Sequence, residues 1–201
     1  LTPNHLAPLQ EGKARADAPR VALGAGTGLG VSLCVRHGDH YRPLASEGGH
    51  IGFAPTSPEQ DRLLVFLRAR HGRVSVERIL SGPGMVELYR FCLADAGLAD
   101  SALLAADHPA EAISQAGLSG KEDAAKSCLR LFAEIYGQTA GDLALAAQAS
   151  GGVFLAGGIA PKLLPLLAGG AFLDGFRAKG RFSDWMHTVP VHVILDPDIG
   201  L

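Results

Sequence analysis

The sequence predicts an α/β fold, in which strands and helices alternate along one chain. Short apolar segments at Arg20–Leu23, Val153–Ala156 and Val189–Leu195 have the length and composition of strands. Between the first two, the apolar residues from Cys128 to Leu143 recur with the spacing of one helix face. Because the two kinds of element interleave, the chain is assigned to the α/β class.

The first strand begins a series of strand segments. A glycine-rich segment, Gly24–Gly30, separates it from a second strand at Val31–Arg36. His37–Asp39 is predicted to turn the chain into a pairing strand at His40–Pro43. Before these strands, Leu1–Pro19 is polar, contains prolines and has no periodicity, so it is interpreted as a connector.

The segment after these strands has a clear helix start. Ser57 is predicted to cap a helix, with Pro58 at its first position and Gln60 completing a capping box. Apolar residues then follow with helical spacing, and Gly72 is predicted to end the helix.

Several shorter helices are expected to follow. Ser75 is predicted to cap a short helix that contains Glu77, and Ser81 and Pro83 are predicted to begin another. A further helix is expected over Pro109–Ala116.

The second half of the chain is expected to be mostly helical. A capping-box pattern at Ser119–Glu122 is predicted to open the long helix, on which Gly137 and Gly141 indicate close packing against another element. The apolar stretch Ser150–Leu173 is interrupted by prolines and glycines, which favours a strand and short helices over a membrane span. Another helix is expected over Ala171–Lys179.

Composition limits the classes of function. Of the 201 residues, 47% are hydrophobic and 19% are charged, as in an ordinary globular domain. The 18 basic and 20 acidic residues give a net charge of −2, so neither nucleic acid nor an anionic membrane is an expected partner. Cys34, Cys92 and Cys128 are scattered and form no CxxC pair, which predicts reduced thiols in a cytoplasmic protein.

The glycine run at 24–30 has two interpretations. It is either a hairpin turn or a phosphate cradle, in which exposed backbone N–H groups and the Thr27 hydroxyl bind an anion. A dinucleotide fingerprint needs a third glycine where Leu29 stands and a helix where a strand is predicted, which disfavours a dinucleotide-dependent oxidoreductase. The Gly-Lys-Ser/Thr ending of a P-loop is also missing.

Two carboxylates and an imidazole lie beside glycines further along. A carboxylate accepts hydrogen bonds from two sugar hydroxyls and a histidine binds a third, so Glu47, His50 and Glu77 together favour a polyhydroxylated ligand. Taken singly, each has a structural interpretation: a solvated loop carboxylate, a structural histidine, and a carboxylate near a helix N-terminus. His50 also lacks a partner at the spacing of a zinc site.

Gly157 and Gly158 end an apolar strand and precede a helix. An isolated Gly-Gly pair is most simply a tight turn between strand and helix. The functional alternative is that a nucleotide base or ribose lies against the bare backbone at the carboxyl end of the strand.

Taken together, five segments resemble the bacterial glucokinase family of the hexokinase/actin-like ATPase superfamily. In order they are Gly-Ala-Gly-Thr-Gly-Leu-Gly (24–30), Glu-Gly-Gly-His (47–50), Glu-Arg-Ile-Leu-Ser-Gly-Pro-Gly (77–84), Gly-Gly-Val-Phe-Leu-Ala-Gly-Gly-Ile (151–159) and Lys-Gly-Arg-Phe (179–182). The resemblance covers nearly the whole chain. It does not extend to the ROK-type glucokinases, whose cysteine-rich zinc motif is absent from this sequence.

The resemblance implies a fold, a reaction and a set of site residues. The fold would be an actin-like ATPase (ribonuclease H-like) domain, with a mixed sheet and flanking helices. The reaction would be transfer of the ATP γ-phosphoryl group, with Mg²⁺, to glucose, in a cytoplasmic protein that is often a homodimer. The implied residues are Gly26, Thr27 and Gly28 for the phosphates, Glu47, His50 and Glu77 for glucose, and Gly157 and Gly158 for adenosine.

Two features of the family are absent from the sequence. The family's aspartate base stands in an Asn-Asp motif and its first phosphate loop reads Asp-x-Gly-Gly-Thr, and neither occurs here, so no catalytic residue is assigned. Residues 1–19 are therefore interpreted as a connector from a missing N-terminal domain, and residues 20–201 as the larger C-terminal domain without its final helix. Such a fragment is expected to be inactive by itself. The alternative is a non-catalytic sugar-sensing module on the same fold.

Overall fold

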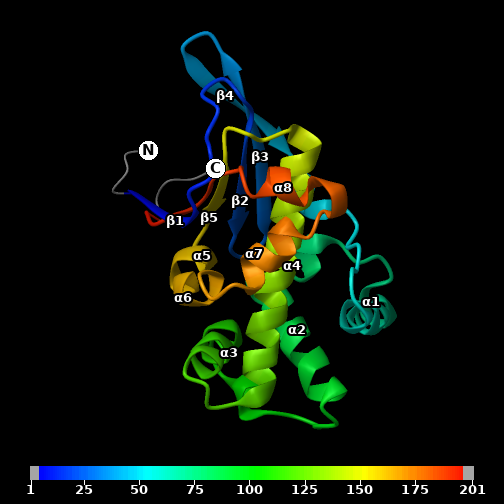
Figure 1. Ribbon diagram of the computed structural model, residues 1–201. Helices are drawn as coiled ribbons and strands as arrows, with labels where there is room; N and C mark the ends of the chain where they lie inside the picture. Colours follow the sequence, from blue (N-terminus) through cyan, green and yellow to red (C-terminus); the bar gives the residue numbers. More distant parts are fainter. Residues whose placement is uncertain (1–4, 197–201) are drawn as a thin grey trace.

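The computed structural model describes residues 5–196, and within them six strands form one mixed sheet (Figure 1). The strands are β1 (Leu6–Gln10), β2 (Arg20–Ala25), β3 (Leu29–His37), β4 (His40–Ser46), β5 (Val153–Ala156) and β6 (Val191–Ile194). They lie in the order β1-β6-β5-β2-β3-β4, in which β2, β5 and β6 are parallel and the remaining pairs are antiparallel. This arrangement confirms the predicted α/β class and mixed sheet.

The meander β2-β3-β4 follows the expected pattern. Val21 pairs with Leu33 and Leu23 with Val31 across the first hairpin, whose turn is the glycine-rich segment. The second hairpin turns at Gly38, whose φ of 58° suits glycine. β4 runs to Ser46, beyond its predicted end at residue 43, and so leads directly into the segment that contains Glu47 and His50.

The interpretation of residues 1–19 as a connector is wrong for Leu6–Gln10. These residues form β1, which pairs with β6 at one edge of the sheet. Pro8 disfavoured a strand in the sequence, because proline lacks the N–H that a central strand needs for its ladder of hydrogen bonds. An edge strand such as β1 tolerates it. The side chain of Gln10 fixes the strand by donating hydrogen bonds to the carbonyls of Met186 and Val189.

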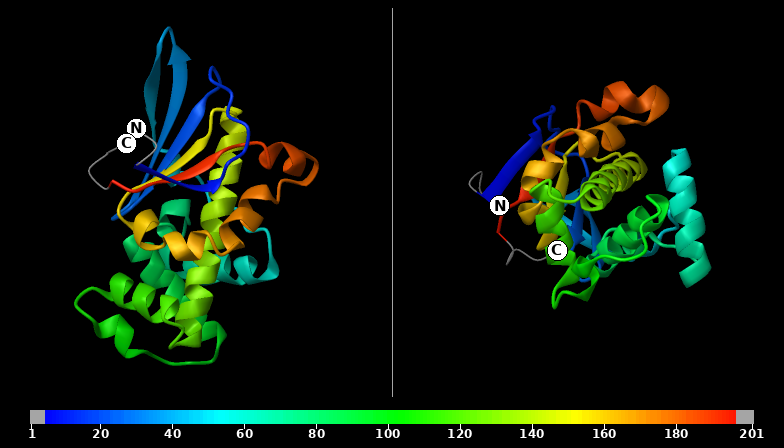
Figure 2. Two further views of the ribbon diagram at one scale, coloured as in Figure 1. Left: turned by 60° about the vertical axis from the view of Figure 1, so that its left-hand side comes forward. Right: turned by 90° about the horizontal axis from the view of Figure 1, so that it is seen from below.

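Helices cover one face of the sheet and extend beyond its end (Figures 1 and 2). The α-helices are α1 (Pro58–His71), α2 (Gly82–Asp95), α3 (Pro109–Leu118), α4 (Asp123–Ala147), α5 (Ile159–Lys162), α6 (Leu164–Leu167), α7 (Ala171–Arg177) and α8 (Ser183–Met186). Short 3-10 helices are η2 (Gly48–His50), η3 (Val76–Arg78), η4 (Ala102–Ala105) and η5 (Gly180–Phe182). In Figure 1 the sheet occupies one end of the molecule, and α2, α3 and the beginning of α4 occupy the other.

The long helix α4 passes closely by α7, as its glycines predicted. A Cβ on Gly137 would lie 1.8 Å from the carbonyl oxygen of Phe172, and one on Gly141 would lie 2.6 Å from that of Phe176. Only glycine permits this approach. Beside the crossing, the buried rings of Tyr136 and Phe172 pack edge to face, which completes the core between α4 and α7.

Two of the predicted helix starts are confirmed. The Ser57 hydroxyl accepts a hydrogen bond from the backbone N–H of Gln60 at the start of α1. The Ser81 hydroxyl accepts one from Gly84 at the start of α2. In contrast, Ser75 precedes the 3-10 helix η3 and makes no capping bond through its side chain.

The predicted capping box at Ser119–Glu122 is wrong. Ser119 ends α3, Gly120 follows with a φ of 68°, and α4 begins only at Asp123. Ser-Gly suits the end of one helix as well as the start of the next, and here the chain turns first. Glu122 instead accepts a hydrogen bond from Tyr89 of α2, and burial together with this bond raises the pKa of Tyr89 to about 12.

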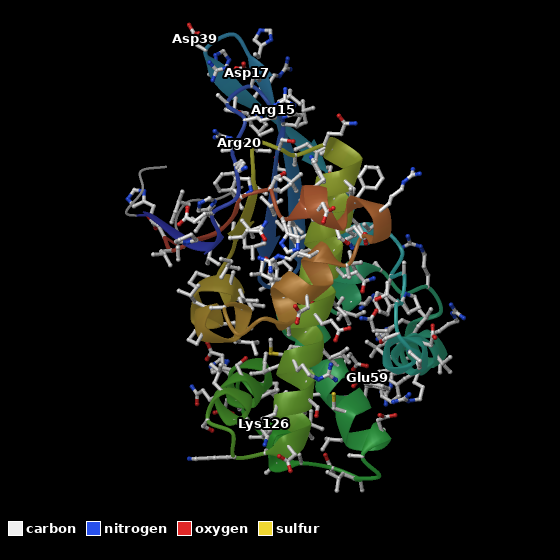
Figure 3. The ribbon with its side chains drawn as sticks, in the orientation of Figure 1. Arg15, Asp17, Arg20, Asp39, Glu59 and Lys126 are labelled. Atoms are coloured by element: carbon white, nitrogen blue, oxygen red, sulfur yellow. The ribbon has the colours of Figure 1, made fainter. Side chains whose placement is uncertain are left out.

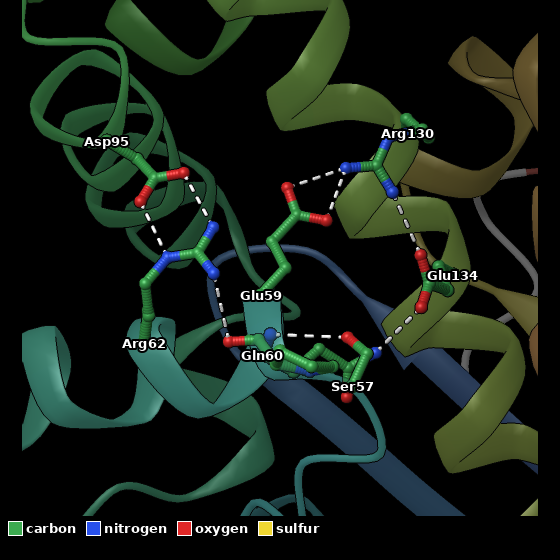
Figure 4. Close-up of polar contacts among 8 residues, drawn as sticks. Ser57, Glu59, Gln60, Arg62, Asp95, Arg130 and Glu134 are labelled. Carbon is green, nitrogen blue, oxygen red and sulfur yellow. Dashed lines mark hydrogen bonds and ion pairs between the residues drawn. The ribbon is translucent and has the colours of Figure 1, made fainter.

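Polar contacts fix α1 against its neighbours (Figure 4). Arg62 of α1 pairs with Asp95 of α2 at 2.8 Å, and Arg130 of α4 pairs with Glu59 of α1 at 2.6 Å. Gln60, whose side chain is buried, donates to Glu134 of α4 at 2.9 Å. α1 therefore has a defined position although it lies at the side of the molecule.

The apolar stretch Ser150–Leu173 does not form one long helix. It contains β5, α5 and α6, and no helix among residues 5–196 is both long and apolar enough to cross a membrane. Cys92 and Cys128 are buried free thiols, and Cys34 is half-buried. Acidic and basic side chains are spread over the molecule: Asp39 lies at the tip of the second hairpin and Lys126 at the opposite end (Figure 3).

Candidate functional site

His50 lies between the two carboxylates that the sequence singled out. Its Nε2 atom is 3.8 Å from Oε2 of Glu47, and its Nδ1 atom is 3.9 Å from Oε1 of Glu77. Glu47 directly precedes η2 and His50 is the last residue of η2, which follows β4, whereas Glu77 lies in η3. The structure therefore brings the three side chains together from two separate segments, with Glu47 the most exposed and Glu77 the least.

Glu77 is held in place by the start of β3. Its Oε2 atom accepts a hydrogen bond of 2.9 Å from the backbone N–H of Leu29, and its own carbonyl accepts one from the Ser81 hydroxyl. A Cβ on Gly28 would lie 2.7 Å from Oε2 of Glu77, so this carboxylate lies directly against the glycine-rich turn. Oε1 remains directed toward His50.

The glycines of the 47–50 segment serve packing rather than ligand approach. A Cβ on Gly49 would lie 2.2 Å from the carbonyl oxygen of Leu29, and one on Gly48 would lie 2.9 Å from Val31. Both glycines let η2 lie flat on β3. Arg73 adds a further constraint by donating a hydrogen bond of 2.6 Å to the His50 carbonyl.

The turn between β2 and β3 contains Gly26, Thr27 and Gly28. The Gly26 N–H donates to the Gly28 carbonyl at 2.9 Å, and the Gly26 carbonyl accepts from Gly82 at the start of α2 at 2.8 Å. Thr27 is exposed at the tip, while Gly28 faces Glu77 and Gly26 faces the opposite direction. The turn therefore contacts Glu77 through Gly28 and the start of α2 through Gly26.

On the α2 side, an open cavity of about 610 Å³ lies among four elements. They are the β2–β3 turn, the beginning of α2, the inner face of α3 and the α5 segment. Most of the lining is apolar, which is usual for small-molecule sites. The lining residues include Gly26, Thr27, Met85, Ser114, Leu118, Gly158, Ile159 and Lys162.

Gly157 and Gly158 have different positions at this cavity. Gly158 lines it, and a Cβ there would meet no atom within 4 Å. Gly157 does not line it; its φ is +80° and a Cβ would lie 2.4 Å from the Ala25 carbonyl. Gly157 is therefore required for the tight turn after β5, and only Gly158 offers bare backbone to a ligand.

Several of the residues that line the cavity stand in no recognisable sequence motif. Met85, Ser114 and Leu118 come from two helices and show only ordinary helical patterns. Lys162 of α5 pairs with Glu111 of α3 at 2.6 Å, and both line the cavity. No local motif marks them, because the wall forms only when three separate helices meet.

A family model described as glucokinase matches residues 1–201. The chain belongs to the glucokinase family. It is 40% identical over 219 residues to the glucokinase of Trichormus variabilis and 39% identical over 201 residues to that of Salmonella arizonae. Both matches cover 100% of this chain but only 64% and 61% of the relatives, so it spans less than two thirds of their length.

Solved structures agree with this membership. The glucokinase of an Antarctic psychrotroph superposes with a TM-score of 0.88 at 34% identity, covering 98% of this glucokinase-family chain and 59% of that protein. The glucokinase of Balamuthia mandrillaris, in complex with glucose, superposes with a TM-score of 0.84 at 22% identity, over 96% and 55% of the two chains. A ROK hexokinase from Thermus thermophilus reaches only 0.55. The expected actin-like ATPase fold is thereby confirmed.

Proposed function

We propose that the protein containing this chain transfers the γ-phosphoryl group of ATP to the 6-hydroxyl of glucose. The observation that carries the proposal is the convergence of Glu47, His50 and Glu77 beside a turn whose Thr27 opens onto a separate apolar cavity. A polar cluster and an apolar cavity on two sides of one turn suit a sugar and a nucleotide that meet at the phosphates. The glucokinase relatives support glucose as the sugar.

Glucose would be bound by hydrogen bonds to charged groups. Glu77, with one oxygen fixed by Leu29, would accept from sugar hydroxyls, and Glu47 and His50 would bind other hydroxyls. Such bonds also give specificity, since a ligand without the hydroxyl leaves a carboxylate unpaired.

ATP would occupy the apolar cavity, with its phosphates at the turn. Gly26 and Thr27 would contact the phosphates, Gly28 would support the turn from the Glu77 side, and Gly158 would face the base or ribose. Gly157 would act only indirectly, by shaping the β5–α5 turn. A ROK-family glucokinase from Streptomyces griseus, which has the same fold at 20% identity, was solved with glucose and AMPPNP, which supports simultaneous binding of a sugar and a nucleotide.

Magnesium would enter with the nucleotide. Among residues 5–196 no three His, Cys, Asp or Glu side chains are grouped to hold a metal ion. None of the described residues 5–196 is therefore assigned as a magnesium ligand. We likewise assign no residue of this chain as the general base. A cytoplasmic location and a homodimeric state are parts of the same proposal.

Calorimetry on the 201-residue chain tests the proposal. Glucose should bind, and Glu77→Gln should weaken glucose binding at least tenfold, because a hydrogen bond to a charged group is lost. Binding of AMPPNP should be unchanged in this variant. Glu11→Gln, an exposed carboxylate after β1, is the matched control. Glucose affinity unaffected by Glu77→Gln would refute the assigned sugar site.

A sugar sensor without catalysis is the second candidate. A ROK-family transcriptional regulator superposes with a TM-score of 0.58 at 16% identity, so the fold also occurs in a regulator. ATP-dependent formation of glucose 6-phosphate by the full-length protein supports the kinase. Tight glucose binding without any product would support the sensor instead.

A further inference from the structure

A second, smaller cavity lies beside the glycine-rich turn. Its volume is about 120 Å³, below the roughly 300–1,000 Å³ of sites that enclose a whole small molecule, so it suits one compact group. Thr27 and Pro83 line both this cavity and the apolar cavity. Glu77, from the proposed sugar site, also lines it. The small cavity therefore lies between the proposed nucleotide and sugar sites.

Arg78 contributes an unpaired positive charge to this cavity. It follows Glu77 as the last residue of η3, and its side chain has no ion-pair or hydrogen-bond partner among residues 5–196. Other polar groups of the wall are already engaged. Oε2 of Glu77 accepts from Leu29, and the Ser81 hydroxyl accepts from Gly84. The five N–H donors of the guanidinium are therefore available to a ligand.

The charges around Arg78 favour an anion in the cavity. The Glu87 carboxylate, which also lines it, is balanced by Arg70 at 3.8 Å and Arg90 at 3.7 Å rather than by Arg78. The first turn of α2 forms another part of the wall, and the positive end of a helix dipole favours negative charge there. A guanidinium matches phosphate through two parallel hydrogen bonds, so phosphate is the anion that best uses these donors.

We propose that Arg78 binds the phosphate group of a hexose 6-phosphate. This inference rests on the proposed function, of which such a sugar phosphate is the product. Lys162, the basic residue of the apolar cavity, is already paired with Glu111 at 2.6 Å, whereas Arg78 is free to bind. Glu77 and Arg78 are consecutive residues of η3, so one short segment holds the sugar hydroxyls and the phosphate.

Calorimetry with glucose 6-phosphate on the 201-residue chain tests the inference. Arg78→Met removes the charge and should weaken glucose 6-phosphate binding about tenfold or more, with glucose affinity within about twofold of wild type. Arg78→Lys keeps the charge without the planar fork and should recover part of the affinity. Arg68→Met, at an exposed position of α1 that lines neither cavity, is the matched control and should bind both ligands normally.

Salt dependence gives a second readout, which general structural damage would not change. Added salt should weaken glucose 6-phosphate binding by wild type more than by Arg78→Met, because it screens the attraction between guanidinium and phosphate. Binding of uncharged glucose should respond little in either chain. An equal salt response of the two chains toward glucose 6-phosphate would count against a contact between Arg78 and the phosphate.

Three calorimetric results would overturn the inference. They are no binding of glucose 6-phosphate by wild type, an unchanged affinity for it in Arg78→Met, and an equal loss of glucose and glucose 6-phosphate in that variant. If Glu77→Gln weakens glucose binding while Arg78→Met leaves glucose 6-phosphate binding intact, the inference fails and the proposed function stands. If Glu77→Gln leaves glucose affinity unchanged, the proposed sugar site fails, and the inference fails with it.

Discussion

The carboxylate of Glu77 accepts a hydrogen bond from the backbone N–H of Leu29, 48 residues earlier in the chain. Leu29 is the first residue of β3, directly after the glycine-rich turn. The carboxylate proposed to bind glucose is therefore held directly by the turn proposed to bind phosphate. A displacement of the turn would move Glu77, so substitutions in the turn are expected to change glucose affinity.

Gly28→Ala should weaken glucose binding. The added Cβ would lie 2.7 Å from Oε2 of Glu77, so either the carboxylate or the turn must move and the bond to Leu29 weakens. We expect about a tenfold loss of glucose affinity by calorimetry. Gly26→Ala is the matched control, because a Cβ there meets no atom within 4 Å. Equal glucose affinity in the two variants would contradict this view of the turn.

Gly158→Leu should block nucleotide binding selectively. Gly158 lines the apolar cavity with a φ of −73°, so a side chain is allowed there and fills space in the cavity. We expect AMPPNP affinity to fall at least tenfold, or about 1.4 kcal/mol, with glucose affinity unchanged, because the leucine side chain occupies space that the nucleotide would fill and so removes many contacts. Gly158→Ala, which adds only one carbon in open space, should bind AMPPNP nearly as well as wild type. Normal AMPPNP binding by the leucine variant would place the nucleotide elsewhere.

The sequence predicted those parts of the fold whose signals are local. Ser57 and Ser81 cap helices through bonds to residues three positions away, and the strands of the β2–β4 meander are adjacent in the chain. β1 was missed because its partner is remote, with Leu6 opposite Ile194. Ser119 was misinterpreted because the same residue types end one helix and begin another.

In the candidate site, too, only residues with a local sequence signal could be predicted. Glu47, His50 and Glu77 were identified because each stands in a short motif, and the structure brings them together. Residues such as Met85 and Lys162 were not identified, because they meet only after α2, α3 and α5 have packed. The Gly-Gly pair also did not reveal that its two members have different roles. Gly157 is required by its positive φ, whereas Gly158 lines the cavity.

Gly137→Ala should destabilise the fold. Replacing glycine by alanine inside a helix ordinarily stabilises it by about 1 kcal/mol. Here the new Cβ would lie 1.8 Å from the backbone oxygen of Phe172, which cannot rotate away as a side chain does. We expect the free energy of unfolding to fall by about 2–3 kcal/mol, measured by urea denaturation. An unchanged or increased value would show that α4 and α7 do not cross this closely.

His192 should make stability depend on pH. Burial lowers its pKa in the folded chain, although Glu11 raises it in part, and its Nδ1 atom has no hydrogen-bond partner. The unfolded chain therefore binds a proton at a higher pH than the folded chain does. The contribution to stability is complete above the unfolded pKa, near 6.5, and is lost as pH falls through the lower folded value.

Because the ring of His192 stacks on Phe154, His192→Phe should keep the packing and flatten the fall in stability below pH 6.5. His187→Phe, at an exposed position, is the control and should retain the fall. Urea midpoints measured from about pH 5 to about pH 7.5, a range that brackets the ordinary histidine pKa, test this assignment. An identical pH profile for wild type and His192→Phe would contradict it.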